Sequence, residues 1–267
     1  MVTTDPLLRP LETIPNDEIV VHYQPVISIE DRTIRGVEAL VRWSHPRHGL
    51  LKPDRFIPLA ERSGAIGPLT WEVLRKVIDQ HVAWKRDGLL LAVSVNISAS
   101  FLASPDVADD ILALLRRKGF EPRQLTLEIT ETRATSNPRV ARALLNQLRD
   151  AGVAVSMDDY GVGHSTLERL DLLPFSDLKI DRGLVAEIAS SREVRSVVEG
   201  LITIAAERNL NLTAEGIETE EQWNTLKQLG CRCGQGFLIA RPMPGHQVSN
   251  WIGEMHGRDH LHAAEPG

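Results

Sequence analysis

Residues 153–166 read VAVSMDDYGVGHST, a short apolar run that ends in two adjacent aspartates. The run predicts a buried strand with Asp158 and Asp159 at its end, and glycines follow at 161 and 163. Neighbouring carboxylates repel each other unless a positive charge lies between them. The pair therefore either points apart into solvent, as in the commoner turn role of such residues, or binds a shared cation.

The composition limits the classes of function. The chain has 267 residues, enough for one large α/β domain or two smaller ones, and its 30 basic and 36 acidic residues give a net charge of −6. This balance argues against polymeric nucleic acid or an anionic membrane as a partner. No apolar run reaches the ~20 residues of a membrane span. With Cys231 and Cys233 as the only cysteines, we expect a reduced, cytoplasmic protein.

Short apolar runs alternate with longer amphipathic segments along most of the chain. This pattern predicts an α/β fold, a (βα)₈ barrel, although a doubly wound open sheet fits the same periodicity. A hairpin-length link, residues 29–33, joins the first two runs, so we expect the first strand to be antiparallel to the rest. The predicted strands are residues 18–28, 33–43, 91–97, 125–130, 153–158, 177–181, 211–215 and, weakly, 231–238. The predicted helices include residues 68–86, 106–118, 137–151, 191–208 and 219–229.

Each of seven predicted strands carries a charged or amide residue late on its polar face, since side chains alternate between the two faces of a strand. In a barrel these strand ends form the mouth that holds active sites. One such residue alone is usually solvated or caps a helix, but seven converging residues favour a functional explanation. They are Glu38, Asn96, Glu128, Asp158, Lys179, Glu215 and Gln235.

The residue types indicate the kind of metal. Carboxylate and amide oxygens without Cys or His suit hard cations, Mg²⁺ or Mn²⁺. Glu38, Glu128, Asp158 and Asp159 together carry four negative charges, which two divalent ions would balance. Two such ions can activate a water and stabilise an in-line displacement at phosphorus. In this hypothesis Asp158 bridges both ions and Asp159 binds only the second.

A series of short motifs resembles the EAL-domain family of cyclic di-GMP phosphodiesterases over roughly residues 17–253. The motifs are YQPV (23–26), EALVRW (38–43), PDRFIPLAE (53–61), VNIS (95–98), LEITET (127–132), DDYGVG (158–163), LKID (178–181), AEGIET (214–219) and QGFLIARPMP (235–244). The resemblance implies a modified TIM barrel with an antiparallel first strand. It implies hydrolysis of this bacterial second messenger to linear pGpG with two Mg²⁺ or Mn²⁺ ions, and we expect Ca²⁺ to inhibit.

The resemblance also implies a role for each matching residue. The ligands of the first metal would be Glu38, Asn96, Glu128 and Asp158. Those of the second would be Asp158 and Asp159, with Glu215 beside it. Lys179 would hold or deprotonate the attacking water, and Gln235 would support the metal-bound waters. The substrate contacts would be Gln24, Leu40 and Arg42, whereas Glu131 would anchor the loop after the aspartates and Glu218 would lie near that loop.

We expect an N-terminal extension (1–16), an EAL phosphodiesterase domain (17–256) and a polar C-terminal tail (257–267), assembled as a homodimer. The loop after the aspartates differs from the family's usual DDFGTGYSS mildly at Tyr160, which replaces Phe, and more strongly at Val162 and His164, which replace Thr and Tyr. In the family that loop couples the metal site to the dimer interface. We therefore expect the differences to affect the turnover rate and the coupling between the dimer interface and the metal site, and not metal binding. A receptor that binds cyclic di-GMP without cutting it and a scaffold that has lost the ligand are the alternatives, but the intact carboxylates and Lys179 favour the enzyme.

Overall fold

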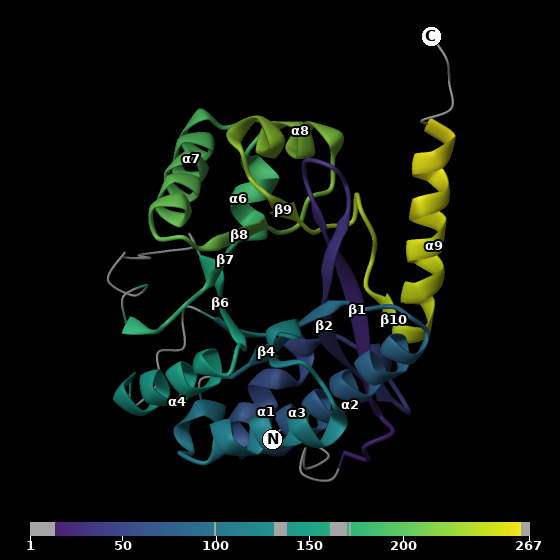
Figure 1. Cartoon of the computed structure of the whole chain (residues 1–267), viewed down its shortest axis with the longest axis vertical. Coiled ribbons are helices and arrows are strands. Elements are labelled where there is room, and N and C mark those ends of the chain that lie inside the picture. The colour runs from purple at the N-terminus through teal and green to yellow at the C-terminus, as the bar shows by residue number, and fades with distance from the viewer. Residues whose placement is uncertain (1–13, 99, 131–137, 161–169, 171, 263–267) are drawn as a thin grey trace, which may run out of the picture.

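The computed structural model describes residues 14–98, 100–130, 138–160, 170 and 172–262, with only the backbone at residues 130 and 256–262. Eight strands form a closed barrel with helices around it (Figure 1), in the order β1–β9–β8–β7–β6–β5–β4–β2 and back to β1. The barrel strands are β1 (Ile19–Ser28), β2 (Ile34–His45), β4 (Ala92–Ile97), β5 (Leu125–Thr130), β6 (Ala154–Tyr160), β7 (Asp177–Ile180), β8 (Asn211–Ala214) and β9 (Cys233–Gly234). The predicted α/β barrel is therefore confirmed.

Strand β1 runs antiparallel to both of its barrel neighbours, β2 and β9, while the other neighbouring barrel pairs are parallel. The short β1–β2 link causes this, because a connection of this length can only reverse the chain. It is closed by a hydrogen bond of 2.8 Å from the Ser28 backbone N–H to the Thr33 carbonyl. The prediction of an antiparallel first strand is confirmed.

The five predicted helices form close to their expected bounds. They are α2 (Ile66–Arg86), α3 (Val107–Lys118), α4 (Pro138–Asp150), α7 (Arg192–Glu207) and α8 (Glu220–Leu229). The short helices α1 (Ile57–Ser63) and α6 (Arg182–Glu187), the 3₁₀ turns η2 (Pro53–Arg55), η3 (Phe101–Ala103) and η4 (Pro122–Gln124), and the outer strands β3 (Gly49–Leu51) and β10 (Met243–Pro244) were not expected. None of the helices in the described part of the chain has the length and apolar character of a membrane span.

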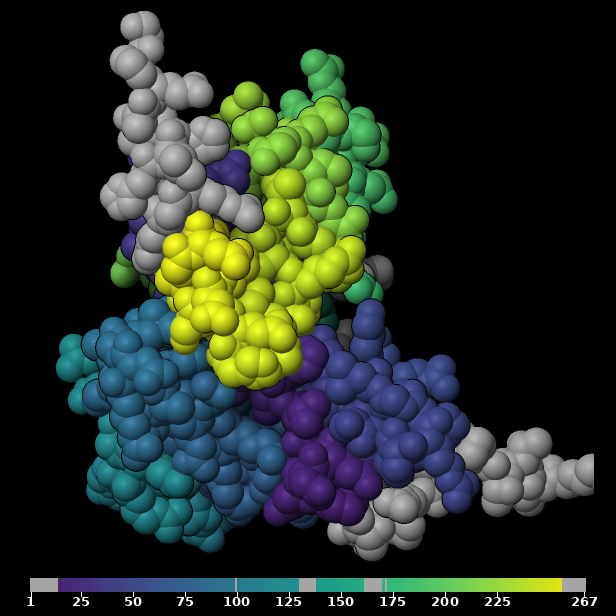
Figure 2. Space-filling view, turned by 90° about the vertical axis from the view of Figure 1, so that its right-hand side faces the viewer, coloured from purple at the N-terminus to yellow at the C-terminus, as the bar shows by residue number. Residues whose placement is uncertain are grey.

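Helix α9 (Gly245–His262) spans the expected boundary between the domain and the C-terminal tail. Val248 and Ile252, one turn apart, are both buried and fix the first turns of this helix. Trp84 of α2 also donates its indole N–H to the Gly245 carbonyl at 3.0 Å. Helix α9 contacts β1, and Figure 2 shows this C-terminal segment in yellow against the purple N-terminal part of the chain. The division into extension, domain and tail stays a prediction.

The core lies between the outward faces of the barrel strands and the surrounding helices. Val95, Leu127 and Val155 on the strands are fully buried, as are Leu74 of α2 and Leu145 of α4. Each such side chain contributes roughly 1.5–3 kcal/mol to folding. Because these apolar residues face the helices, the intervening polar residues on the same strands face the barrel interior.

The start of α8 offers a direct test of local stability. Thr219 and Gln222 form a reciprocal capping box, in which the Thr219 hydroxyl accepts from the Gln222 backbone N–H at 3.2 Å. Thr219→Ala is expected to lower the free energy of unfolding by about 0.5–2 kcal/mol, measured by urea denaturation. Thr203→Ala in the middle of α7 is the matched control, because alanine is the better helix former there. An equal loss in both variants would contradict the capping role.

Candidate active site

The structure brings the seven predicted residues together at the C-terminal end of the barrel. Register places Asn96 beside Glu128 on neighbouring strands, and Asp158 stands two residues beyond Ser156, the residue paired with Glu128 on β6. Glu215 and Gln235 directly follow the last residues of β8 and β9. Glu38, Glu128, Asp158, Lys179 and Gln235 are buried, Glu215 is half-buried and Asn96 is exposed. One layer of the barrel interior is thus polar and charged.

Lys179 lies at the centre of this layer and contacts four carboxylates. Its Nζ is 2.8 Å from Glu128, 3.3 Å from Glu38 and 3.5 Å from Asp158, and it forms a fourth ion pair with Glu215. Burial lowers the pKa of the Lys179 ammonium, but the four carboxylates outweigh it and raise the pKa well above its ordinary value. Lys179 is therefore held in its charged form.

Two amide side chains hold the carboxylates in place. Asn96 donates its Nδ2 to Glu38 at 2.8 Å and to Glu128 at 3.3 Å. Gln235 donates its Nε2 to Glu38 at 2.7 Å and to Gln24 at 2.9 Å. The buried Oε1 of Gln235 has no hydrogen-bond partner among the described residues. A buried acceptor of this kind needs a donor, and a metal-bound water would supply one.

The carboxylates carry more negative charge than Lys179 can balance. Burial opposes the ionisation of Glu38, but Lys179 and the two amide donors hold its pKa below the ordinary value. Burial raises the pKa of Glu128 well above its ordinary value. Lys179 lowers this pKa, but the neighbouring carboxylates raise it further. Burial likewise raises the pKa of Glu215 to about 8. Additional positive charge would stabilise the ionised forms.

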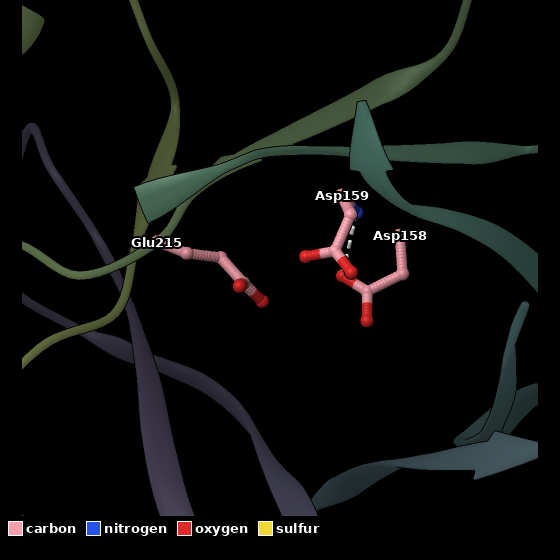
Figure 3. Close-up of side chains that lie close together, drawn as sticks. All are labelled: Asp158, Asp159 and Glu215. Atoms are coloured by element: carbon pink, nitrogen blue, oxygen red, sulfur yellow. Dashed lines mark hydrogen bonds between the residues drawn. The ribbon is translucent and has the colours of Figure 1, made fainter. Parts of the chain in front are cut away.

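Asp158, Asp159 and Glu215 form a cluster that can hold a metal ion. One carboxylate oxygen from each lies within 4.8 Å of the others, and the three side chains point toward one another in Figure 3. Asp159 has a φ of +58°, a left-handed conformation that Asp tolerates better than most residues. Desolvation and the Asp158 charge raise the pKa of Asp159 to about 6. The oxygen-only donor set fits a hard divalent cation.

A cavity of about 380 Å³ opens beside this cluster. Its polar wall includes Glu38, Asn96 and Asp158, and its apolar wall comes from residues 53–73. Several residues that line the cavity were not predicted individually as site residues. They are Ala39, Val41, Pro53, Asp54, Ile57, Pro58, Glu61, Ile66, Leu69, Thr70, Val73, Ile97 and Ser98. The motif at 53–61 was the available signal, but its apolar residues are equally typical of a core helix.

The predicted substrate contacts lie at or near this cavity. Leu40 is half-buried and lines it. Gln24 is buried and donates its Nε2 to the Ala240 carbonyl at 2.9 Å. Arg42 donates to the Val41 carbonyl at 2.9 Å, and burial lowers the pKa of its guanidinium against the attraction of Glu38 and Asp54.

Among the described residues, no contact joins the remaining predicted residues to the cluster of Asp158, Asp159 and Glu215. Glu218 is exposed just before α8, where its backbone N–H donates to Gln222 Oε1 at 2.7 Å. Glu131, Val162 and His164 lie outside the described residues. Their expected roles in the loop after the aspartates therefore stay predictions.

Known proteins match nearly the whole chain. The sequence model of the EAL domain matches residues 9–242. The bifunctional diguanylate cyclase/cyclic di-GMP phosphodiesterase MucR of Pseudomonas aeruginosa is 39% identical over 238 residues, 89% of this chain and 35% of MucR. The cyclic di-GMP phosphodiesterase PdeR of Escherichia coli is 35% identical over 240 residues, 90% of this chain and 36% of PdeR.

A solved structure agrees in fold and in sequence. The structure described as the PaMucR phosphodiesterase in a c-di-GMP complex has a TM-score of 0.81 and 40% identity, and the match covers 87% of this chain and 94% of that chain. The curated relatives are longer, so the chain spans about a third of the length of those it matches.

Proposed function

Because this chain belongs to the EAL domain family, we propose that it is a metal-dependent phosphodiesterase that hydrolyses cyclic di-GMP to linear pGpG. The observation that supports this most directly is the buried layer of carboxylates around Lys179, next to a cavity of about 380 Å³. A purely structural role does not account for so much buried charge, since burying ionised groups is costly unless they are paired. The relatives named as cyclic di-GMP phosphodiesterases support the choice of substrate.

We propose that two Mg²⁺ or Mn²⁺ ions bind at the mouth of the barrel. The residues that would hold them are Glu38, Asn96, Glu128, Asp158 and Asp159, with Glu215 beside the second ion. When bound, such ions lower the pKa of a water and stabilise negative charge that develops at phosphorus. They would also balance the carboxylate charge that exceeds what Lys179 carries.

The chain's own residues would then orient the substrate and the attacking water. Lys179, whose ammonium form the surrounding carboxylates stabilise in the metal-free protein, would hold or deprotonate the attacking water. Gln235 would fix metal-bound water through its free Oε1. The Arg42 guanidinium suits a phosphate oxygen, and Gln24 and Leu40 would contact the rest of the substrate.

The decisive experiment is incubation of the purified protein with cyclic di-GMP and a single divalent ion, with pGpG measured by chromatography. Product is expected with Mg²⁺ or Mn²⁺. In Ca²⁺, a larger ion with looser geometry, we expect binding by calorimetry without turnover. Binding without product in all three ions would identify a receptor instead, and neither binding nor product would overturn the proposed substrate.

We further propose that the protein is a homodimer, as the resemblance to the family implies. Light scattering at working concentration is expected to give twice the chain mass of 29.6 kDa. A single mass of 29.6 kDa across the concentration range would contradict it. The cytoplasmic location inferred from Cys231 and Cys233, which are unpaired in the structure, is also a proposal.

A further inference from the structure

A second cavity, of about 290 Å³, lies inside the barrel at the end away from the candidate active site. Ala92, Asp177 and Asn211, the first residues of β4, β7 and β8, line it. Glu128 and Lys179 also line it, so the inner end of this cavity reaches the layer of carboxylates around Lys179. A single water needs only about 10–15 Å³, whereas small-molecule sites begin near ~300 Å³. The cavity therefore holds far more than one water and lies at the lower end of the range for small-molecule sites.

Hydroxyl side chains line this cavity where a barrel interior is ordinarily filled by Val, Ile and Leu. They are Ser94, Thr126, Ser156 and Thr213. Each stands two residues before Asn96, Glu128, Asp158 or Glu215 and so faces the same side, the barrel interior. Small polar residues at this level leave the interior open and supply donors and acceptors.

Ser156 gives the most specific indication of a ligand. The residue is 2% exposed and lines the cavity, yet its Oγ has no hydrogen-bond partner among the described residues. Leaving a buried hydroxyl unpaired is costly, and native structures rarely do so. A molecule with its own hydroxyl groups would satisfy Ser156 Oγ.

The charges at the two ends disfavour an ion of either sign. At the inner end, Glu128 shares Lys179 with three other carboxylates, so negative charge is in excess there in the metal-free protein. At the outer end lie the exposed Arg35 and Arg232, which repel a cation. Asp177, the acidic residue nearby, already accepts hydrogen bonds from Ser176 at 2.6 Å and Asn211 at 3.0 Å. We propose that this cavity binds a small uncharged molecule with several hydroxyl groups.

Xylitol, a neutral five-carbon polyol, is the probe for this site. Because polyols stabilise many proteins without binding, the readouts are saturation-transfer NMR of xylitol and a crystal soak rather than a melting temperature. We expect saturable transfer to xylitol and density for it between Ser156 and Thr213. The measurement needs no cyclic di-GMP or metal, so its result is independent of the proposed enzymatic function.

Variants locate the site. Ser156→Ala and Thr213→Val each remove one hydroxyl with little change in volume and should weaken xylitol binding about two- to tenfold, the effect of one hydrogen bond. Thr225→Val is the matched control, because its hydroxyl donates to the Glu221 carbonyl within α8, away from the cavity. No transfer to xylitol, transfer that neither cavity variant weakens, or sulfate density in the cavity would each overturn the proposal.

Discussion

Replacing Asp158 with asparagine is expected to lower kcat for cyclic di-GMP by at least about 10³-fold. Asp158 lies 3.5 Å from Lys179 and forms a carboxylate cluster with Asp159 and Glu215. Asparagine keeps the shape of the side chain but removes a negative charge that would help to hold the ions. Metal stabilisation of the transition state amounts to several kcal/mol, and each 1.36 kcal/mol is about tenfold in rate.

A matched surface variant separates this effect from general destabilisation. Asp79→Asn removes an exposed carboxylate 2.6 Å from Lys118, a pair worth about 0–1 kcal/mol. It should leave kcat and KM unchanged. The measurements are steady-state formation of pGpG with Mn²⁺ and calorimetric binding of Mn²⁺ to both variants. A folded Asp158→Asn protein with kcat within a few-fold of the wild type would remove Asp158 from the proposed metal centre.

The sequence alone predicted the barrel and its polar interior well, for a specific physical reason. In residues 93–98, VSVNIS, strict alternation of apolar and polar side chains defines two faces. A similar alternation in residues 36–43 and 125–130 predicts that Glu38, Asn96 and Glu128 lie at one level. The structure adds their contacts, such as Asn96 donating to both Glu38 and Glu128.

Other features depend on tertiary context that no local pattern encodes. Strands β3 and β10 are too short to show alternation, and each forms by pairing with a longer strand, β2 or β1. The predicted strand 231–238 is reduced to β9 because the backbone at Gly236 packs directly against Ile217, where a Cβ would clash. The sequence does contain a signal for the second cavity, since Ser94 and Thr126 stand at inward positions that usually carry bulky residues. This signal indicates a cavity only when the strands are known to close into a barrel.

Glu215 and its partner Lys179 make the stability of the metal-free protein depend on pH. Burial raises the pKa of Glu215 from its ordinary value of 4.5 to about 8 in the folded state. Between these two pH values the folded state therefore binds more protons than the unfolded state. Stability from this group is therefore fully present below about pH 4.5 and is lost as the pH rises through about 8. Lys179 stays protonated across this window and limits the loss by pairing with the ionised carboxylates.

Lys179→Met should therefore have two separable effects. Turnover is expected to fall about 10²- to 10⁴-fold, the range for removal of a group that positions or transfers a proton. The metal-free variant should also melt lower at pH 8 than at pH 5.5, by a larger margin than the wild type, because the four carboxylates around Lys179 lose their shared cation. Lys118→Met, which removes an exposed surface lysine, is the control and should change neither property.

Adding Mn²⁺ then distinguishes a catalytic role of Lys179 from a structural one. Divalent ions replace the missing positive charge, so the melting temperature of Lys179→Met at pH 8 is expected to return toward the wild-type value. Turnover is not expected to return, because the ions cannot supply the hydrogen bond that Lys179 would donate to the attacking water. Calorimetry should show Mn²⁺ and cyclic di-GMP still binding to the variant. If metal binding were lost together with activity, Lys179 would be a structural residue of the carboxylate layer, and if Mn²⁺ restored turnover, its charge alone would account for its role.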